Sequence, residues 1–248
     1  MAGRIAAPPQ VRQYGIPFRS NEHENMIFET LLSQMPYLVH GLTVAIGLLV
    51  CLLSLGLALG LVLAILEVYG HWTLRLVCVL FERVFRGIPA IVLLLLFYYG
   101  VTDYIEMGSF TAAVLALGLR SAAYQSQIFR GAFLSVPNGQ MMAARAMGMN
   151  KLQAIRDIII PQALRMSIGP WTNEFSSELK ATSLAYVIGV VELTRQAKYI
   201  ISNTQGNILV VFGVVALMYF VVNRAGNWAL YRLENRLSLP GFEHRGDA

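Results

Sequence analysis

The run YLVHGLTVAIGLLVCLLSLGLALGLVLAIL, residues 37–66, decides the fold class of this chain. It contains no lysine, arginine, aspartate or glutamate, and it is longer than the ~20 residues that a helix needs to cross a bilayer. Because lipid offers the backbone no hydrogen-bond partner, such a run is stable there as a helix, whose backbone groups bond to one another. The run therefore predicts a membrane-spanning helix.

The composition of the whole chain agrees with this prediction. Of the 248 residues, 56% are hydrophobic and 13% are charged, whereas a soluble domain carries about 25% charged residues. The net charge of +5 could indicate nucleic acid, but the cations lie beside apolar runs, as on the cytoplasmic side of membrane proteins. Cys51 and Cys78 lie in apolar helical stretches and are interpreted as small hydrophobic residues. We expect an all-α membrane protein that binds lipid, no nucleic acid and no metal.

Further apolar runs bring the expected number of crossings to about five. The expected crossings are residues 37–66, 71–100, 110–133, 163–193 and 208–230. They lie in a transmembrane domain, 36–236, between an N-terminal tail with an interfacial amphipathic helix, 1–35, and a polar tail, 237–248. Residues 195–206 are expected to be a hydrophilic turn.

Three residues within the crossings predict local features of the helices: a proline and two glycines. Pro89 lacks a backbone N–H and should kink or restart the second crossing. Gly56 and Gly60 form a GxxxG pair, which allows a second helix to approach closely. We therefore expect a broken second crossing and a close helix contact along the first.

The basic residues predict the orientation of the chain. They gather in the amphipathic first part of the second crossing (Arg75, Arg83 and Arg86), in residues 139–165 and near the C-terminus, whereas Asp103 and Glu106 lie in the loop between the second and third crossings. Since cytoplasmic loops are rich in lysine and arginine, we expect the N-terminus outside and the C-terminus in the cytoplasm. Other cations oppose this orientation: Arg4, Arg12, Arg19, Arg195 and Lys198.

The segment GQMMAARAMGMNKLQAIRDIIIPQALR, residues 139–165, is expected to form a helical hairpin in the cytoplasm. Gly148 should end its first helix in the left-handed conformation. Asn150 should cap a second helix, which Pro161 should end. A short, stiff helix with small residues and methionines suits the groove of another protein. Alternatively, the segment lies on the membrane surface.

Motifs for catalysis or nucleotide binding are missing from the sequence. It contains no GxxxxGK[ST] phosphate-binding loop, no HExxH, no paired CxxC and no GxSxG. The chain is therefore not expected to be an enzyme or to bind ATP. It is a passive pore, an ion-coupled amino acid carrier, or the membrane part of a driven machine.

Four separated blocks resemble one known family. The spacing of Ala143, Ala144, Gly148, Ile158 and Pro161 resembles the EAA…G…I-LP loop of ATP-binding cassette (ABC) importer permeases. The other blocks resemble the polar amino acid branch of that family: FRGIPAIVLLLLFYYG (85–100), SAAYQSQIFRGAFLSVPNGQ (121–140) and LKATSLAYVIGVVELTRQA (179–197). The similarity covers roughly residues 41–237. Departures from the family pattern are Met142, in place of the first glutamate of the loop motif, Gln127, Ala181 and Arg120.

The resemblance implies a type I importer permease with a MetI-like bundle and a cytoplasmic coupling helix, in a prokaryotic inner membrane. Such permeases pair as homo- or heterodimers with two ATPase subunits, which hold ATP and Mg, and an external solute-binding protein delivers a polar amino acid. The coupling loop would be residues 137–161. The residues implied in coupling are Ala143, Ala144, Met147, Gly148 and Met149.

Polar residues inside the third and fourth crossings are candidates for a substrate path, because charges are costly in a membrane. The candidates are Arg120, Tyr124, Gln127, Glu174, Ser177 and Glu178. We expect Arg120 to face the two glutamates or to bind the α-carboxylate of a passing amino acid, since guanidinium suits carboxylates. A glutamate would then receive the α-ammonium group. Alternatively, these residues form ion pairs and hydrogen bonds that hold the helices together without a ligand.

Overall fold

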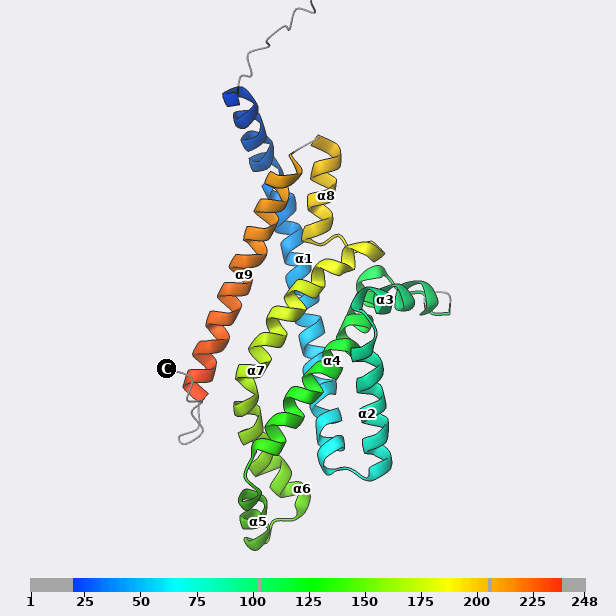
Figure 1. Ribbon diagram of the computed structural model, residues 1–248, viewed down its shortest axis with the longest axis vertical. Coiled ribbons are helices and arrows are strands. Elements are labelled where there is room, and N and C mark those ends of the chain that lie inside the picture. The colour runs from blue at the N-terminus through cyan, green and yellow to red at the C-terminus, as the bar shows by residue number, and fades with distance from the viewer. Residues whose placement is uncertain (1–19, 102–103, 205–206, 238–248) are drawn as a thin grey trace, which may run out of the picture.

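The computed structural model describes residues 20–101, 104–204 and 207–237, and this part of the chain is helical with no β-strand. Long helices form the bundle in Figure 1: α1 (Ser20–Tyr69), α4 (Ser109–Ser135), α7 (Ile160–Ala181) and α9 (Ile208–Leu237). Shorter helices are α2 (Trp72–Gly87), α3 (Ala90–Leu95), α5 (Asn138–Ala146), α6 (Lys151–Ala154) and α8 (Leu193–Thr204). Two π-helical turns and a 3-10 helix complete the set: η1 (Leu96–Val101), η2 (Ile155–Ile159) and η3 (Thr182–Ile188). Most of both expected tails lies outside the described residues.

Each of the five expected crossings falls mainly on helix, but among the described residues only two or three helical segments are long and apolar enough to cross a membrane. The segments Leu32–Tyr69 and Ile208–Leu237 are each long and apolar enough to cross a membrane, and α2 with α3 and η1 forms a third, bent candidate. Helices α4 and α7 have 27 and 22 residues, which also suffices for a crossing of ~20 residues, but they carry more polar side chains. The prediction of an all-α membrane bundle is confirmed.

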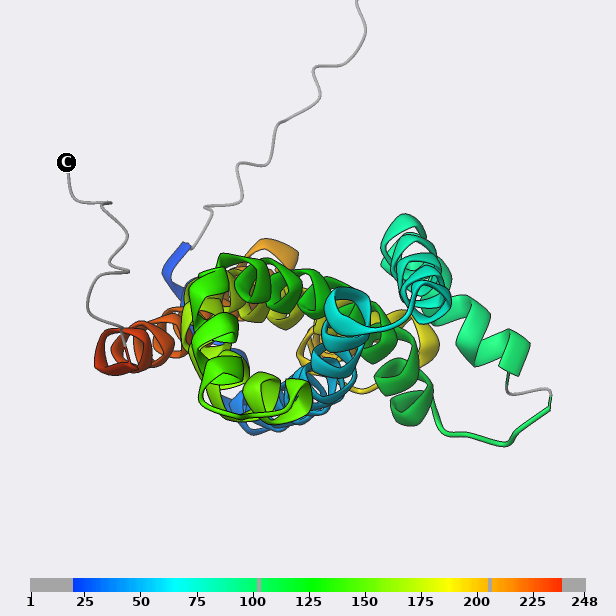
Figure 2. The ribbon, with the colours of Figure 1, turned by 90° about the horizontal axis from the view of Figure 1, so that it is seen from below.

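The second crossing is broken at Pro89, as predicted. Helix α2 ends at Gly87, Ile88 is extended, and Pro89 caps α3. A proline disfavours the helical conformation of the residue before it. The two halves meet at 102°, so that α3 leaves the bundle sideways (Figure 1). Seen from the end that carries α5 and α6, the α2–α3 pair and α9 lie on opposite sides (Figure 2).

The glycine pair of the first crossing lies where α1 packs against α4. A methyl group on Gly60 would lie 3.0 Å from the backbone oxygen of Ala122 and 3.0 Å from the backbone nitrogen of Ser126. A methyl group on Gly56 would collide with the side chain of Gln125. The predicted close helix contact is confirmed, and it needs both glycines because a side chain there would separate the helices.

The hairpin between α4 and α7, residues 137–161, has the predicted caps. Gly148 follows α5 with a φ of +88°, in the left-handed region where glycine is favoured. The Asn150 side chain accepts a hydrogen bond from the Gln153 N–H at 2.9 Å, and the Gln153 side chain accepts one from the Asn150 N–H at 2.8 Å. This reciprocal pair is a capping box that starts the second helix.

The prediction that Pro161 ends the second helix is wrong. The chain stays helical from Lys151 to Ala181, and Pro161 lies in the first turn of α7. The π-helical turn η2 precedes it, and the N–H of Ile160 donates to the carbonyl of Ile155, five residues back. The missing N–H of proline therefore falls where the hydrogen-bond ladder changes its register. The hairpin is thus joined to α7 without a break.

The prediction of a hydrophilic turn at residues 195–206 is wrong as well, since most of this segment is helix α8. The carboxylate of Glu192 accepts hydrogen bonds from the backbone N–H groups of Thr194, at 2.8 Å, and Arg195, at 2.9 Å. An acceptor at this position satisfies the free donors of the helix N-terminus. The buried side of α8, which includes Leu193 and Ala197, packs with Leu38 of α1 in one apolar cluster.

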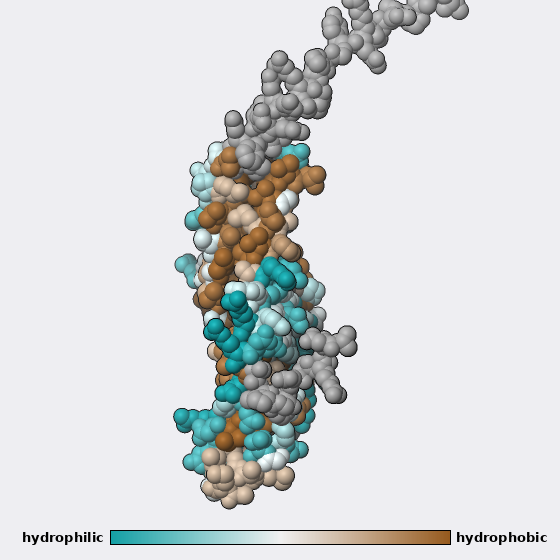
Figure 3. Space-filling model, turned by 90° about the vertical axis from the view of Figure 1, so that its left-hand side faces the viewer, coloured by the Kyte–Doolittle hydropathy of each residue, from teal (hydrophilic) through white to brown (hydrophobic). Residues whose placement is uncertain are grey.

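The two ends of the bundle carry different elements. The hairpin, the α1–α2 turn and the end of α9 lie at one end, whereas the start of α1, α8 and the start of α9 lie at the other (Figure 1). On the side of α9, an apolar band occupies the upper part of the surface and hydrophilic residues gather below it (Figure 3). Exposed side chains that contribute to the apolar part of α9 include Leu209, Leu217 and Phe220.

Candidate functional site

Arg120 of α4 and Glu178 of α7 form an ion pair inside the bundle. The Nη1 atom of Arg120 lies 2.9 Å from Oε1 of Glu178. Glu178 is fully buried, and the Arg120 side chain is 17% exposed. The structure therefore places Arg120 opposite the glutamates, as the sequence suggested, while the role of this pair in holding a ligand stays a prediction.

Glu174 lies one helical turn before Glu178 and is also buried. Among the residues that the structure describes, Oε1 of Glu174 and Oε2 of Glu178 have no hydrogen-bond partner. Like charges one turn apart on a helix repel, and a buried carboxylate needs compensating partners. The Arg120 guanidinium bonds only one oxygen of Glu178. The remaining oxygens of the two carboxyl groups can therefore accept hydrogen bonds from a cationic donor.

Tyr124 connects this ion pair to a second one on α2. Its ring centroid lies 4.7 Å from the guanidinium carbon of Arg120 and 5.0 Å from that of Arg86. Both cations are within the range of a favourable cation–π contact. Arg86 in turn forms an ion pair with Glu82, one turn away on the same helix. The polar contacts therefore extend from α7 across α4 to α2.

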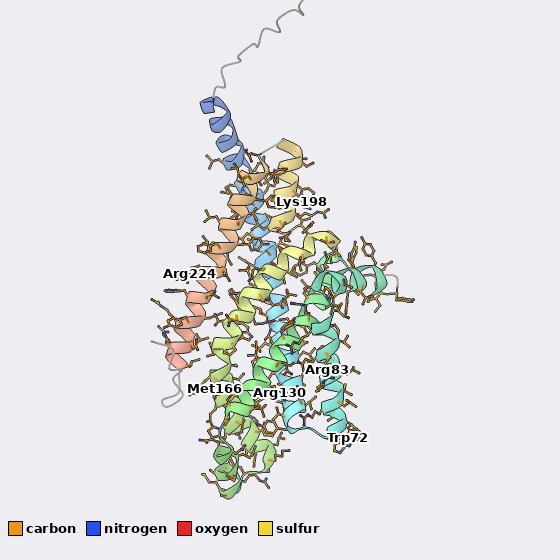
Figure 4. All side chains as sticks on the ribbon, viewed as in Figure 1. Trp72, Arg83, Arg130, Met166, Lys198 and Arg224 are labelled. Atoms are coloured by element: carbon orange, nitrogen blue, oxygen red, sulfur yellow. The ribbon has the colours of Figure 1, made fainter. Side chains whose placement is uncertain are left out.

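Gln127 and Arg130 carry the contacts further along α4, to the end of α1. The side-chain amide of Gln127 donates to Oε2 of Glu67 at 3.0 Å and to Oε2 of Glu82 at 2.6 Å. Arg130 Nε lies 2.9 Å from Oε1 of Glu67, and Figure 4 shows Arg130 in the lower half of the bundle, toward the hairpin. We call this set, together with Glu174 beside Glu178, the polar network; its members are Glu67, Glu82, Arg86, Arg120, Tyr124, Gln127, Arg130, Glu174 and Glu178.

The charges of the polar network do not balance. If every carboxyl group is ionised, four glutamates face three arginines, which leaves room for one more positive charge or for a proton shared between Glu174 and Glu178. Ser177, the remaining candidate from the sequence, is half-buried and takes part in none of the described contacts of the network. No described group of three or more His, Cys, Asp and Glu side chains is placed to hold a metal ion.

Part of the polar network was not found from the sequence. Glu67 directly follows the first predicted crossing and Glu82 lies in the amphipathic first part of the second, where charges are common and carry little information. One available clue was that Gln127 stands where the family usually has a glutamate. The neutral amide can donate to two carboxylates at once, which a glutamate at this position could not do.

The hairpin presents apolar side chains to solvent at the end of the bundle. Met142, Met147 and Leu152 are 67%, 81% and 74% exposed. Exposed apolar groups of this size, gathered on one projecting element, are typical of an interaction surface. The other residues implied in coupling differ in exposure: Ala143 and Gly148 are exposed, Met149 is half-buried and Ala144 is buried.

Comparison with known proteins agrees with the arrangement of these elements. Residues 56–239 match the family model described as binding-protein-dependent transport system inner membrane component. The glutamine transport system permease protein GlnP of Escherichia coli K12 is 34% identical over 210 residues, which are 83% of this chain and 94% of that protein. The arginine ABC transporter permease protein ArtQ of Haemophilus influenzae is 36% identical over 201 residues, 78% of this chain and 90% of that protein.

Two solved structures share the fold. The crystal structure of an amino acid ABC transporter with histidines is 33% identical, with a TM-score of 0.77, and the match covers 84% of this chain and 98% of that one. An inward-facing structure of the MetNI methionine ABC transporter matches at 20% identity with a TM-score of 0.67, over 83% of this chain and 96% of that one. At that identity, the second match supports the fold alone.

Proposed function

Because this chain belongs to the family of binding-protein-dependent transport system inner membrane components, we propose that it passes a polar amino acid through its polar network. The chain is a transmembrane permease subunit of an amino acid ABC importer, like its relatives. The family favours this function over the alternative of an ion-coupled carrier or channel. The observation that carries the proposal is the buried Arg120–Glu178 pair beside carboxylate oxygens without described partners.

The chemistry of the pair matches an α-amino acid. A guanidinium has five N–H donors, and Arg120 uses one of them for Glu178, so others can bind an α-carboxylate. The free oxygens of Glu174 and Glu178 can accept hydrogen bonds from the α-ammonium group. Charged groups that leave water need partners of this kind, because unpaired burial is costly. The amino acid would be bound briefly between α4 and α7.

The hairpin would couple this site to ATP hydrolysis on separate subunits. Its exposed apolar side chains, Met142, Met147 and Leu152, would enter a groove of one of the two ATPase subunits. Those subunits, and not this chain, would bind ATP and Mg. Since the helix continues from Lys151 into α7, a displacement of the hairpin would tilt α7 and move Glu174 and Glu178 relative to Arg120. A second permease copy, identical or related, would complete the assembly.

The proposed orientation follows from the same elements. The chain is a permease of the inner membrane family, and the hairpin must lie in the cytoplasm to meet ATPase subunits. The end of α9 lies at the hairpin end (Figure 1), and this supports a proposed orientation with the C-terminus in the cytoplasm and the N-terminus outside. The external solute-binding protein would then meet the end that carries α8.

The test is transport by the reconstituted complex with Arg120→Gln. We expect amino acid uptake, measured per assembled complex at a temperature at which the variant stays folded, to fall at least tenfold, while basal ATP hydrolysis remains. Arg224→Gln is the matched control, since Arg224 is an exposed arginine of α9. Uptake at the wild-type rate in Arg120→Gln would contradict the proposal.

A further inference from the structure

A pocket of about 310 Å³ lies at the end of the bundle opposite the hairpin. It is lined by Tyr186 and Val187 of η3 and by Arg195, Lys198 and Tyr199 of α8. Figure 4 shows Lys198 at this end. In the proposed orientation, the pocket faces the outside of the cell.

Arg195 is held in a fixed position in this pocket. Its Nε atom donates to the hydroxyl oxygen of Tyr199 at 2.9 Å, and its Nη1 atom donates to the carbonyl oxygen of Tyr186 at 2.9 Å. A guanidinium has five N–H donors, so more than half of them remain for a ligand. The fork of such a group matches the two oxygens of a carboxylate. Arg195 is therefore prepared to bind an anion.

Lys198 brings a second positive charge to the same pocket. It follows Arg195 by three residues on α8, and its ammonium lies 4.1 Å from the ring centroid of Tyr186. No carboxylate among the described residues pairs with Arg195 or Lys198. The nearby Glu192 is occupied by the start of α8 and by the hydroxyl of Tyr219, which donates to it at 2.9 Å. An external anion would relieve the repulsion between the two cations.

These two cations lie on the side of the membrane where the sequence predicts few. The bias of lysine and arginine toward the cytoplasm opposes cations in an outer segment. One explanation is that both side chains reach lipid phosphates, as long cationic side chains do at membrane surfaces. However, such side chains extend along apolar surface toward water, whereas Arg195 is held by two hydrogen bonds within a concave site. The fixed geometry favours one defined carboxylate.

We propose that this pocket docks an aspartate or glutamate side chain on the surface of the solute-binding protein. The proposal rests on the proposed function, which supplies both the orientation and the partner that the family description names. Arg195 would take the carboxylate through its free donors, and Lys198 would add attraction at longer range. Electrostatic contacts of this kind speed association and fix its geometry.

The test is ATP hydrolysis by the complete complex, titrated with its cognate binding protein in bilayers of neutral lipid. We expect Lys198→Gln and Arg195→Gln each to raise the half-saturating concentration of binding protein about tenfold, with an unchanged rate at saturation. The variants should also respond less to added salt than the wild type, because screening weakens exposed charge pairs. Arg224→Gln, in the middle of α9 and outside the pocket lining, should behave like the wild type.

Two variants keep the test independent of folding. Arg195 contributes hydrogen bonds to the fold, whereas the Lys198 ammonium makes only a cation–π contact among the described residues, so Lys198→Gln should leave α8 intact. Unchanged half-saturation in both variants overturns the proposal, and so does an effect that appears only when anionic lipid is added. If the wild-type complex shows no stimulation by a binding protein, the proposed function falls too.

Discussion

Lys151 of the hairpin is bonded to Tyr69 at the end of α1. Its Nζ atom donates to the Tyr69 carbonyl oxygen at 3.1 Å and lies 5.9 Å from the centroid of the Tyr69 ring. The same ring packs edge-on against Phe133 of α4 at 6.0 Å. These contacts connect the hairpin to α1 and α4 through Tyr69, and the continuous helix connects it to α7.

Loss of this contact should weaken coupling. We expect Lys151→Ala to lower the number of amino acids transported per ATP hydrolysed roughly two- to fivefold, as the loss of one modest hydrogen bond allows. Paired measurements of uptake and phosphate release give this ratio. Arg156→Ala is the control on the same hairpin, because the Arg156 side chain is 83% exposed. A transport-to-hydrolysis ratio equal to that of the wild type would show that the Lys151–Tyr69 contact does not contribute to coupling.

Gly148 should be required for the shape of the hairpin. Gly148→Ala places a side chain at a φ of +88°, which costs about 1–2 kcal/mol, although nothing lies within 4 Å of the added methyl. We expect less ATPase to co-purify with the permease. Gly139→Ala makes the same change within α5, also without a neighbour within 4 Å, and should leave co-purification intact. Equal loss in both variants would contradict a conformational role.

The approach of α1 to α4 should depend on Gly60. The methyl of Gly60→Ala would meet α4 backbone atoms at 3.0 Å, and overpacking of this kind typically costs about 1–3 kcal/mol. We expect a lower melting temperature of the purified complex. Gly47→Ala tests the same substitution on α1 at a site with open space around it, and it should not lower the melting temperature. The packing argument fails if the two variants melt alike.

A double-mutant cycle separates a ligand site from a structural ion pair. Breaking a buried pair at one partner costs about 3–5 kcal/mol, so Arg120→Gln and Glu178→Gln should each destabilise the complex. The double variant should recover much of that loss because no unpaired charge remains. If the pair holds the amino acid, thermal stability returns while uptake stays low. Recovery of both stability and uptake would assign the pair a structural role alone.

The sequence by itself determined the features that depend on neighbouring residues. The uncharged run of residues 37–66 required a lipid-spanning helix, Pro89 broke the second crossing, and Gly148 with Asn150 set the two ends at the hairpin turn. Each of these rests on chemistry within a few residues: hydropathy over one helix length, a missing N–H, or a left-handed glycine. The motif of the importer permease family in residues 143–161 could also be found from the sequence, because it is defined by the spacing of residues along the chain.

Only the tertiary structure decided which distant residues meet. Gln127 bonds Glu67 and Glu82, which precede it by 60 and 45 residues, and Arg120 meets Glu178 across 58 residues. The packing of α8 against Leu38 of α1, which accompanies the helical character of residues 193–204, is likewise a contact between distant parts of the chain. The physical reason is that hydrogen bonds and ion pairs act over a few ångströms in space. Sequence spacing fixes the face of a helix on which a charge lies, whereas helix packing fixes which charge stands opposite.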